Sequence, residues 1–188
     1  MPTSVWPAER GYHGAMRTVL VGERPPEVED LLQRRRALGQ DLFDEVWEGD
    51  YHMAPVPHGR HGLVDFELAG ILRPYAMRAG LRGSGPCNIG KPDDYRVPDQ
   101  AYFVGDAPPL TFNPSAEIVV EVVSPGDESR LKYEFYFRIG VAEVVIVDPE
   151  HRTVEWFVRD SSGFRPSEHG NLLDISATAL TEMINWPQ

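Results

Sequence analysis

The order of predicted elements assigns this chain to the α/β (α+β) class, with a mixed β-sheet flanked by helices. Three observations support that class. Residues 117–123 form a nearly continuous β-branched run, which is typical of a central strand covered on both faces. A helix is predicted after it, from Ser124 to about Ile139, and an apolar strand is predicted at 143–147.

The elements before the central strand have their own local signals. Residues 27–38 predict a helix, with acidic residues first and arginines late, and Gly39 ends it. Residues 42–53 alternate as two short strands around a tight turn at Glu48-Gly49-Asp50. Apolar residues at helical spacing predict a further helix over 61–77, which Pro74 is expected to kink or shorten.

Shorter elements complete the prediction. Residues 87–89 predict a weak strand and residues 101–104 a short one. In the helix after the central strand, Ser124 is predicted as the N-cap, and Gly140 ends that helix. Residues 153–159 predict an antiparallel edge strand, and residues 177–184 a closing helix.

Length and composition predict one globular domain. The chain has 188 residues, which we divide into an N-terminal arm, 1–26, and a single domain, 27–188. The single cysteine, Cys87, excludes an internal disulfide and a cysteine-rich zinc site. No stretch is long and apolar enough to span a membrane, and the N-terminus lacks the pattern of a signal peptide, so we expect a cytoplasmic protein.

The net charge of −11 argues against a nucleic-acid ligand, because binding to phosphates depends on lysine and arginine. Net charge does not decide the matter, since basic residues can cluster locally and a metal-binding cleft is itself acidic. Candidates for basic patches are Arg34–Arg36, Arg73, Arg78, Arg82 and Arg96. For the triple arginine, a solvated helix face is the favoured interpretation.

Glu121 is the residue of the central strand that packing explains least well. Period-2 alternation places it on one face with Val119, while Val120 and Val122 lie on the other. Glu117 lies at the strand entrance, where water reaches it, but Glu121 has apolar neighbours on both sides. An unpaired charge there costs several kcal/mol. A buried ion pair is the structural alternative to a functional role.

Three other ionisable residues belong to the same hypothesis. Lys132 borders the apolar stripe of the helix after the central strand, with Tyr136 one turn later, and faces that strand. A lysine that reaches solvent at the edge of the stripe is the alternative. Asp99 follows a proline and Asp50 follows a glycine, so turn chemistry is the default explanation for both.

Two carboxylates and a lysine brought together suggest a particular chemistry. Mg²⁺ or Mn²⁺ prefers carboxylate, carbonyl and water oxygens, which Asp99, Glu121 and the main-chain carbonyl of Val122 would supply. Such a metal polarises a phosphoryl oxygen and lowers the pKa of a bound water, while Lys132 orients that water or stabilises developing charge. This is the chemistry of metal-dependent phosphodiester cleavage.

Several of these segments together resemble one known family. The matching residues are Val97-Pro-Asp99, Glu117-Ile-Val-Val-Glu-Val-Val-Ser-Pro125, Lys132 with Tyr136, Gly140-Val-Ala-Glu143 and Ile146-Val-Asp-Pro149. They resemble the Uma2-type family of endonucleases, which is similar to the restriction-endonuclease-like PD-(D/E)XK superfamily. The likeness extends upstream to Trp47-Glu-Gly-Asp50 and His61.

The resemblance implies a restriction-endonuclease-like core and DNA or another nucleic acid as substrate. It carries Asp99 and Glu121 onto the metal-ligand positions. The usual lysine slot, two residues after the glutamate, holds Val123, so Lys132 looks like a migrated replacement. Asp50 falls where the family generally has an acidic residue. A homodimer is implied by family analogy alone.

Two classes of function therefore compete. The first is a metal-dependent endonuclease, with Asp99, Glu121 and Lys132 as catalytic residues and with Asp50, His61 and Tyr136 as additional candidates. The second is a non-catalytic module that keeps the nuclease fold for binding or interaction. The acidic net charge favours the second, and the joint presence of the three catalytic candidates favours the first.

Overall fold

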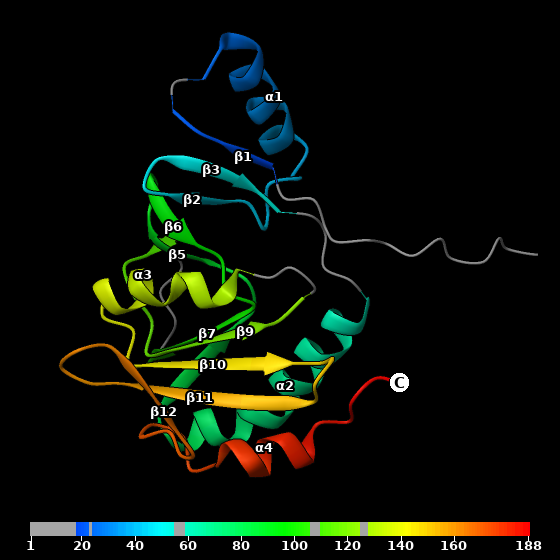
Figure 1. Cartoon of the computed structure of the whole chain (residues 1–188), viewed down its shortest axis with the longest axis vertical. Coiled ribbons are helices and arrows are strands. Elements are labelled where there is room, and N and C mark those ends of the chain that lie inside the picture. The colour runs from blue at the N-terminus through cyan, green and yellow to red at the C-terminus, as the bar shows by residue number, and fades with distance from the viewer. Residues whose placement is uncertain (1–17, 23, 55–58, 106–109, 125–127) are drawn as a thin grey trace, which may run out of the picture.

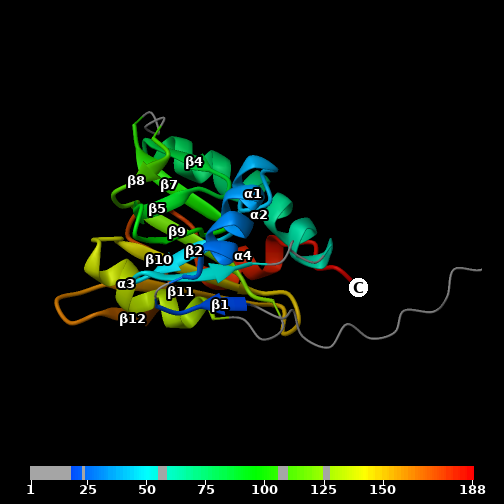
Figure 2. The same cartoon turned by 90° about the horizontal axis from the view of Figure 1, so that it is seen from above.

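The computed structural model describes residues 18–22, 24–54, 59–105, 110–124 and 128–188. Within these residues the chain forms two six-stranded sheets, four α-helices and one short 3₁₀ helix (Figure 1). Helices α1 (Pro26–Ala37) and α4 (Ala177–Met183) lie at opposite ends of the long axis, and Figure 2 looks down on α1. None of the helices in this part of the chain is long and apolar enough to cross a membrane.

The first sheet has the strand order β1-β3-β2-β6-β5-β8. Its strands are β1 (Thr18–Leu20), β2 (Glu45–Trp47), β3 (Asp50–Met53), β5 (Asn88–Lys91), β6 (Asp94–Arg96) and β8 (Phe112–Asn113). Leu32 of α1 packs against Val46 and Tyr51 on this sheet and forms a small separate core. The sheet as a whole is an addition that the sequence did not predict, because most of its strands are only three or four residues long.

The second sheet has the strand order β12-β11-β10-β9-β7-β4 and contains the central strand. Its strands are β4 (Leu81–Ser84), β7 (Gln100–Val104), β9 (Ile118–Val122), β10 (Glu143–Asp148), β11 (Thr153–Arg159) and β12 (Phe164–Ser167). Strand β9 pairs in parallel with β10 and antiparallel with β7, so the sheet is mixed as predicted.

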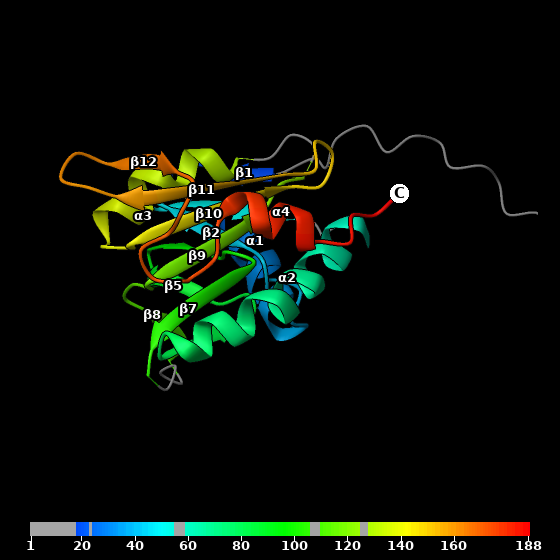
Figure 3. The same cartoon turned by 90° about the horizontal axis from the view of Figure 1, so that it is seen from below.

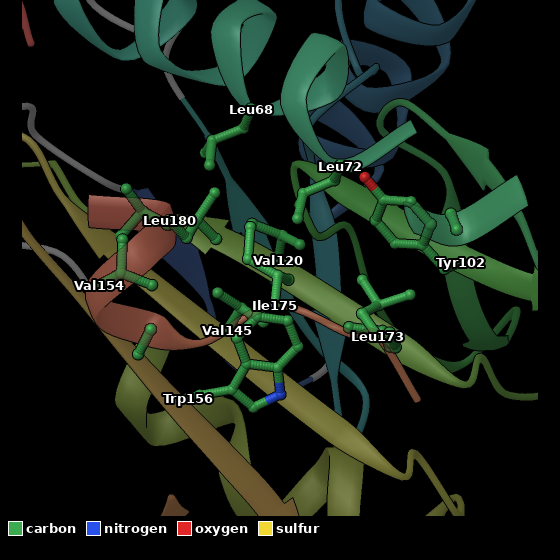
Figure 4. Packing of buried hydrophobic residues seen from close by; sticks show 14 of the residues in the cluster. Leu68, Leu72, Tyr102, Val120, Val145, Val154, Trp156, Leu173, Ile175 and Leu180 are labelled. Atoms are coloured by element: carbon green, nitrogen blue, oxygen red, sulfur yellow. The ribbon is translucent and has the colours of Figure 1, made fainter. Parts of the chain in front are cut away.

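Helices cover both faces of the second sheet. Helix α2 (Gly59–Arg78) and α4 pack on one face, where Val120 contributes to the main core together with Leu68 and Leu72 (Figures 3 and 4). The 3₁₀ helix η1 (Ser129–Lys132) and α3 (Tyr133–Arg138) lie over the other face, to which Val119 contributes. The predicted alternation along the central strand is therefore confirmed.

Three local predictions are wrong. Strand β11 is not an edge strand, because β12 pairs with it on the side away from β10. The helix after the central strand is shorter than predicted, since Glu128 is not helical and regular structure starts as a 3₁₀ turn at Ser129. Helix α2 continues past Pro74 to Arg78, so the proline does not shorten it.

The N-terminal part of the chain joins the fold earlier than the proposed arm boundary implies. Thr18–Leu20 lies within residues 1–26 and pairs antiparallel with β3 as strand β1. Residues 1–17 lie outside the described part of the chain. The hairpin of β2 and β3 and the closing helix α4 are confirmed near their predicted positions.

Candidate active site

The candidate site lies where the C-terminal end of β9 meets the N-terminal end of β7. The two strands are antiparallel neighbours with Gln100 opposite Val120, so Asp99, the residue before β7, lies beside the last residues of β9. The Asp99 Oδ2 atom accepts a hydrogen bond of 2.7 Å from the backbone N–H of Val122. Strand register alone thus brings Asp99 next to Glu121.

His61, in the first turn of α2, holds the other oxygen of Asp99. Its Nε2 atom lies 2.7 Å from Asp99 Oδ1, and its Nδ1 atom lies 3.1 Å from the hydroxyl of Ser124. Because the carboxylate only accepts, Nε2 carries a hydrogen. The ring links α2 to the end of the central strand and fixes the orientation of Asp99. The sequence-based suggestion that His61 lines the site is consistent with this position.

Glu121 projects from the α3-facing side of β9 and is 3% exposed. Lys132 Nζ lies 3.1 Å from each of its two carboxylate oxygens. The Tyr136 hydroxyl donates to Oε1 at 2.5 Å, and the Ser129 hydroxyl lies 3.5 Å from Oε2. Both residues that the sequence placed next to Glu121 are therefore in contact with it.

A third carboxylate, Glu45, reaches the same lysine from strand β2 of the first sheet. Its Oε1 atom lies 2.8 Å from Lys132 Nζ and accepts a hydrogen bond of 2.9 Å from the N–H of Val97. Its Oε2 atom accepts a hydrogen bond of 2.6 Å from Trp47 Nε1. Sequence reasoning missed Glu45. The available signal was a carboxylate in an alternating strand, as for Glu121, but the strand is only three residues long.

Burial and charge shift the pKa values of the three groups in the lysine network. Burial raises the pKa of Glu121 to about 8; Lys132 opposes the shift, and the carboxylates of Asp99 and Glu45 add to it. Burial would also raise the pKa of Glu45, but Lys132 and the two hydrogen bonds from Val97 and Trp47 lower it below its ordinary value. Burial would lower the pKa of Lys132, yet Glu121 and Glu45 raise it.

The site therefore carries more negative charge than its own lysine balances. Three carboxylates, those of Glu45, Asp99 and Glu121, surround the single buried ammonium of Lys132. Burial is the main cause of the raised pKa of Glu121, and the charges of Asp99 and Glu45 add to it. Any further cation at this position would be attracted by the remaining charge.

Two other sequence candidates do not join this cluster. Asp50 begins strand β3 in the first sheet, and its Oδ1 atom lies 3.3 Å from the backbone N–H of Gly22. Arg96, proposed for a basic surface, is 4% exposed and donates to the carbonyl of Val46. Its guanidinium carbon stands 4.1 Å from the centre of the Phe135 ring. Arg96 thus helps to join the first sheet to α3.

The donor chemistry of the site fits a hard divalent cation. Asp99 and Glu121 offer carboxylate oxygens, Val122 next to Glu121 offers a main-chain carbonyl, and such ions keep several waters. Within the described residues, no three Asp, Glu, His or Cys side chains are arranged as a ready ligand cage. Two carboxylates and a carbonyl are a sufficient protein contribution for an ion of this type.

Comparisons with known proteins place the chain in a family and a fold. Residues 28–183 match the family model Uma2, described as "Putative restriction endonuclease". The chain is also similar to a solved structure described as "a putative nuclease belonging to DUF820 from Anabaena variabilis ATCC 29413". The sequences are 15% identical and the TM-score is 0.57, over 74% of this chain and 90% of that one. No curated protein matches significantly.

The likeness to the solved structure shows the fold, and the family model shows the family. The matched residues include every residue of the candidate site, from Glu45 to Tyr136. The chain belongs to the Uma2 family.

Proposed function

We propose that this protein is a metal-dependent endonuclease that hydrolyses phosphodiester bonds of DNA. The observation that carries the proposal is the cluster of carboxylates at the end of β9, where Glu121 and Glu45 contact Lys132 and Asp99 adds its charge. Membership of a family described as restriction endonucleases supports a nucleic-acid substrate. Perturbed ionisable groups clustered with a charge partner mark functional sites more often than structural ones.

Asp99, Glu121 and the carbonyl of Val122 are the residues proposed to hold Mg²⁺ or Mn²⁺. Such an ion, when bound, supplies Lewis-acid polarisation of the phosphoryl oxygen and a bound water of lowered pKa. His61 and the Val122 N–H each occupy one oxygen of Asp99, which leaves further lone pairs on that carboxylate available and fixes their direction. Tyr136 fixes Glu121 in the same way.

Lys132 supplies positive charge to the site. Its ammonium contacts Glu121 and Glu45, which keeps it charged in a buried position where it would otherwise lose its proton. A charged group held without freedom to reorganise stabilises the negative charge that develops on a phosphoryl group in the transition state. Glu45 holds the lysine in place and is proposed as a positioning residue.

The test combines calorimetric titration of Mn²⁺ with plasmid nicking, for the wild type and for Asp99→Asn and Glu121→Gln. We expect both substitutions to abolish metal binding and to slow nicking by at least about 100-fold, as removal of one transition-state contact typically does. Glu143→Gln is the matched control, because Glu143 is a buried glutamate on the adjacent strand β10 and lies outside the cluster.

The control should bind the metal and nick DNA with the wild-type rate per folded molecule. Nicking that survives in Glu121→Gln, or metal affinity that does not change, would contradict the proposal. Circular dichroism of each variant separates loss of the site from loss of the fold.

A non-catalytic binding module of the same fold is the alternative, and one observation favours it. Lys132 Nζ lies within 3.1 Å of two Glu121 oxygens and 2.8 Å of Glu45, so its three hydrogens already have carboxylate partners. The ammonium would then serve as part of a buried ion network. That alternative predicts wild-type protein that neither binds Mn²⁺ nor nicks DNA, and a Glu121→Gln variant that differs from it only in stability.

A further inference from the structure

A groove of about 700 Å³ runs between α2 and the edge of the second sheet at β4. It begins beside the candidate site and ends near the C-terminus of α2. The lining residues that matter here are Asp65, Arg73, Met77, Gly80, Arg82 and Gln100. Figure 3 shows α2 lying along this side of the sheet.

Two residues at the inner end of the groove, Gln100 and Asp65, are close neighbours of residues in the candidate site. Gln100 directly follows Asp99, and its side-chain Nε2 donates to the carboxylate of Asp65 at 2.7 Å. Asp65 lies one helical turn after His61 on α2. Strand β7, which follows Asp99, and helix α2, which carries His61, therefore both continue into the walls of the groove.

The walls of the groove have a charge opposite to that of the molecule. The charged residues of the lining are Arg73, Arg82 and Asp65, so the groove carries a net positive charge. The whole chain has a net charge of −11. Basic residues concentrated along one channel of an acidic protein indicate an anionic occupant of that channel.

The arginines are placed to act on an occupant. Arg73 lies on the exposed side of α2 and, among the described residues, has no carboxylate within ion-pair distance. Arg82, on strand β4, also lines the groove. Arg78, the residue directly after the groove residue Met77, stacks on the Tyr75 ring with 4.5 Å between its guanidinium carbon and the ring centre.

The wall on the strand side is largely backbone. Gly80 and Gly105 adopt φ angles of +72° and +71°, and the N–H of Gly105 donates to the carbonyl of Gly80 at 3.1 Å. In the described part of the chain, no atom stands within 4 Å of where a Cβ would lie on either residue. Gly83 is different, since a Cβ there would lie 2.8 Å from the Tyr102 ring, which explains that glycine by packing alone. The open backbone leaves room for a chain to lie along the groove.

We propose that this groove binds the sugar–phosphate backbone of one nucleic-acid strand and leads it to the candidate site, with Arg73 and Arg82 contacting phosphates. The assignment rests on the proposed nuclease function and adds to it the path of the substrate. From Asp65 to Met77 the helix advances about 18 Å, so the groove is long enough for several backbone contacts. Contacts of this kind position a strand without selecting its sequence.

The experiment measures the affinity for a fluorescein-labelled DNA duplex and for its single strand by fluorescence anisotropy, in EDTA so that no cleavage occurs. Wild type, Arg73→Ala, Arg82→Ala and the double variant are compared over a range of salt concentrations. Arg165→Ala is the matched control, because Arg165 is an exposed arginine on β12, at the opposite edge of the same sheet.

We expect each groove substitution to weaken binding several-fold and to reduce the slope of log Kd against log salt by about one, and the double variant by about two. The control should leave both unchanged. Equal binding by wild type and groove variants, or no binding by wild type at low salt, would overturn the assignment.

The two proposals fail separately. If the groove substitutions do not weaken DNA binding but metal-dependent nicking is observed, the groove proposal is rejected and the nuclease proposal stands. If the groove substitutions weaken DNA binding but the wild type never nicks DNA, the nuclease proposal is rejected and the groove remains a nucleic-acid binding site. A mass in solution that falls from dimer to monomer in Met77→Asp, without any change in DNA affinity, would instead assign the groove to a second copy of the chain.

Discussion

Glu121 and Glu143 lie on adjacent parallel strands, are both buried, and have opposite kinds of surroundings. Glu121 is 3% exposed and Glu143 is 1% exposed. Glu143 accepts hydrogen bonds from neutral groups: Trp156 Nε1 at 2.9 Å and the backbone N–H groups of Asn171 and Leu172 at 2.5 and 3.1 Å. Glu121 is held by a lysine, with two further carboxylates nearby.

The difference shows that burial of a carboxylate does not identify a functional group. Glu143 fastens the loop at Asn171 and Leu172 to the end of the second sheet, and neutral donors satisfy both of its oxygens. Glu121 lies in a cluster whose charges do not cancel, and burial raises its pKa to about 8. Charge imbalance, more than burial, separates the candidate site from a structural polar contact.

The largest expected effect is on stability, in Lys132→Met. Removing the ammonium leaves Glu45 and Glu121 buried without a cation, so the free energy of unfolding should fall by about 3–5 kcal/mol. Urea unfolding followed by circular dichroism measures the change. Much of the loss should be recovered when Glu45→Gln and Glu121→Gln are added, because the carboxylates that the lysine compensated are then neutral.

A triple variant no more stable than Lys132→Met alone would show that the lysine contributes by packing rather than by charge. Arg130→Met is the control: Arg130 lies two residues away and pairs with Glu155 on the surface, where the loss of an ion pair costs at most about 1 kcal/mol.

Matched glutamine substitutions on the two strands test the comparison directly. In Glu143→Gln, one end of the amide is an NH₂ group that must face an N–H donor, so the variant should lose about 1–3 kcal/mol of stability. In Glu121→Gln the amide also faces donors, but Lys132 keeps Glu45 as a carboxylate partner and burial already disfavours the charged form of Glu121, so the loss of stability should be smaller. Urea midpoints of both variants at neutral pH provide the measurement.

If Glu121→Gln is destabilised as much as Glu143→Gln, the two carboxylates are both structural, and the distinction drawn from their surroundings is wrong. Midpoints are compared only where both transitions have the same m-value as wild type, since a changed m-value reports a change in the denatured or native state.

The sequence predicted the part of the site that local patterns determine. Alternation along β9 placed Glu121 on the face opposite Val120, and helical spacing after it placed Lys132 and Tyr136 beside it. These predictions hold because strand and helix periods decide which side chains share a face. The family resemblance supplied Asp99, whose contact with Val122 follows from strand register.

The rest depended on how distant elements pack. Glu45 reaches Lys132 from another sheet, and nothing in a three-residue strand indicates which element will cover it. Strand β12 was missed because Pro166 and Ser167 give it little β signal, which made β11 look like an edge. The sequence indicated Arg73, Arg78 and Arg82 as candidates for a basic patch. It did not indicate that strand β4 forms a groove with α2.

The smallest expected effect concerns Asp148, a partly exposed counterpart of Glu143. Asp148 also accepts from two backbone N–H groups, of Glu150 and His151, and from a ring nitrogen, His151 Nδ1, at 2.9, 3.0 and 2.8 Å. The hydrogen bond to Asp148 and its charge raise the pKa of His151 above the ordinary 6.5. Partial burial would raise the pKa of Asp148, but the N–H groups and ring of His151 lower it below 3.8.

The raised His151 pKa adds stability that is complete below pH 6.5 and is lost as the pH rises through the folded-state pKa. The lowered Asp148 pKa adds stability that is present above pH 3.8 and is lost as the pH falls. The contact is therefore strongest between these two limits.

NMR titration of the His151 ring should give a pKa above 6.5 in the wild type and a return to the ordinary value in Asp148→Asn. Identical titration curves would mean that the contact does not persist in water. The expected result is a measurable pKa shift of His151 together with an unfolding midpoint that Asp148→Asn leaves unchanged. That result would show that hydrogen bonds to Glu143 contribute to stability because they are buried. Similar hydrogen bonds to Asp148 add little, because water competes for that carboxylate.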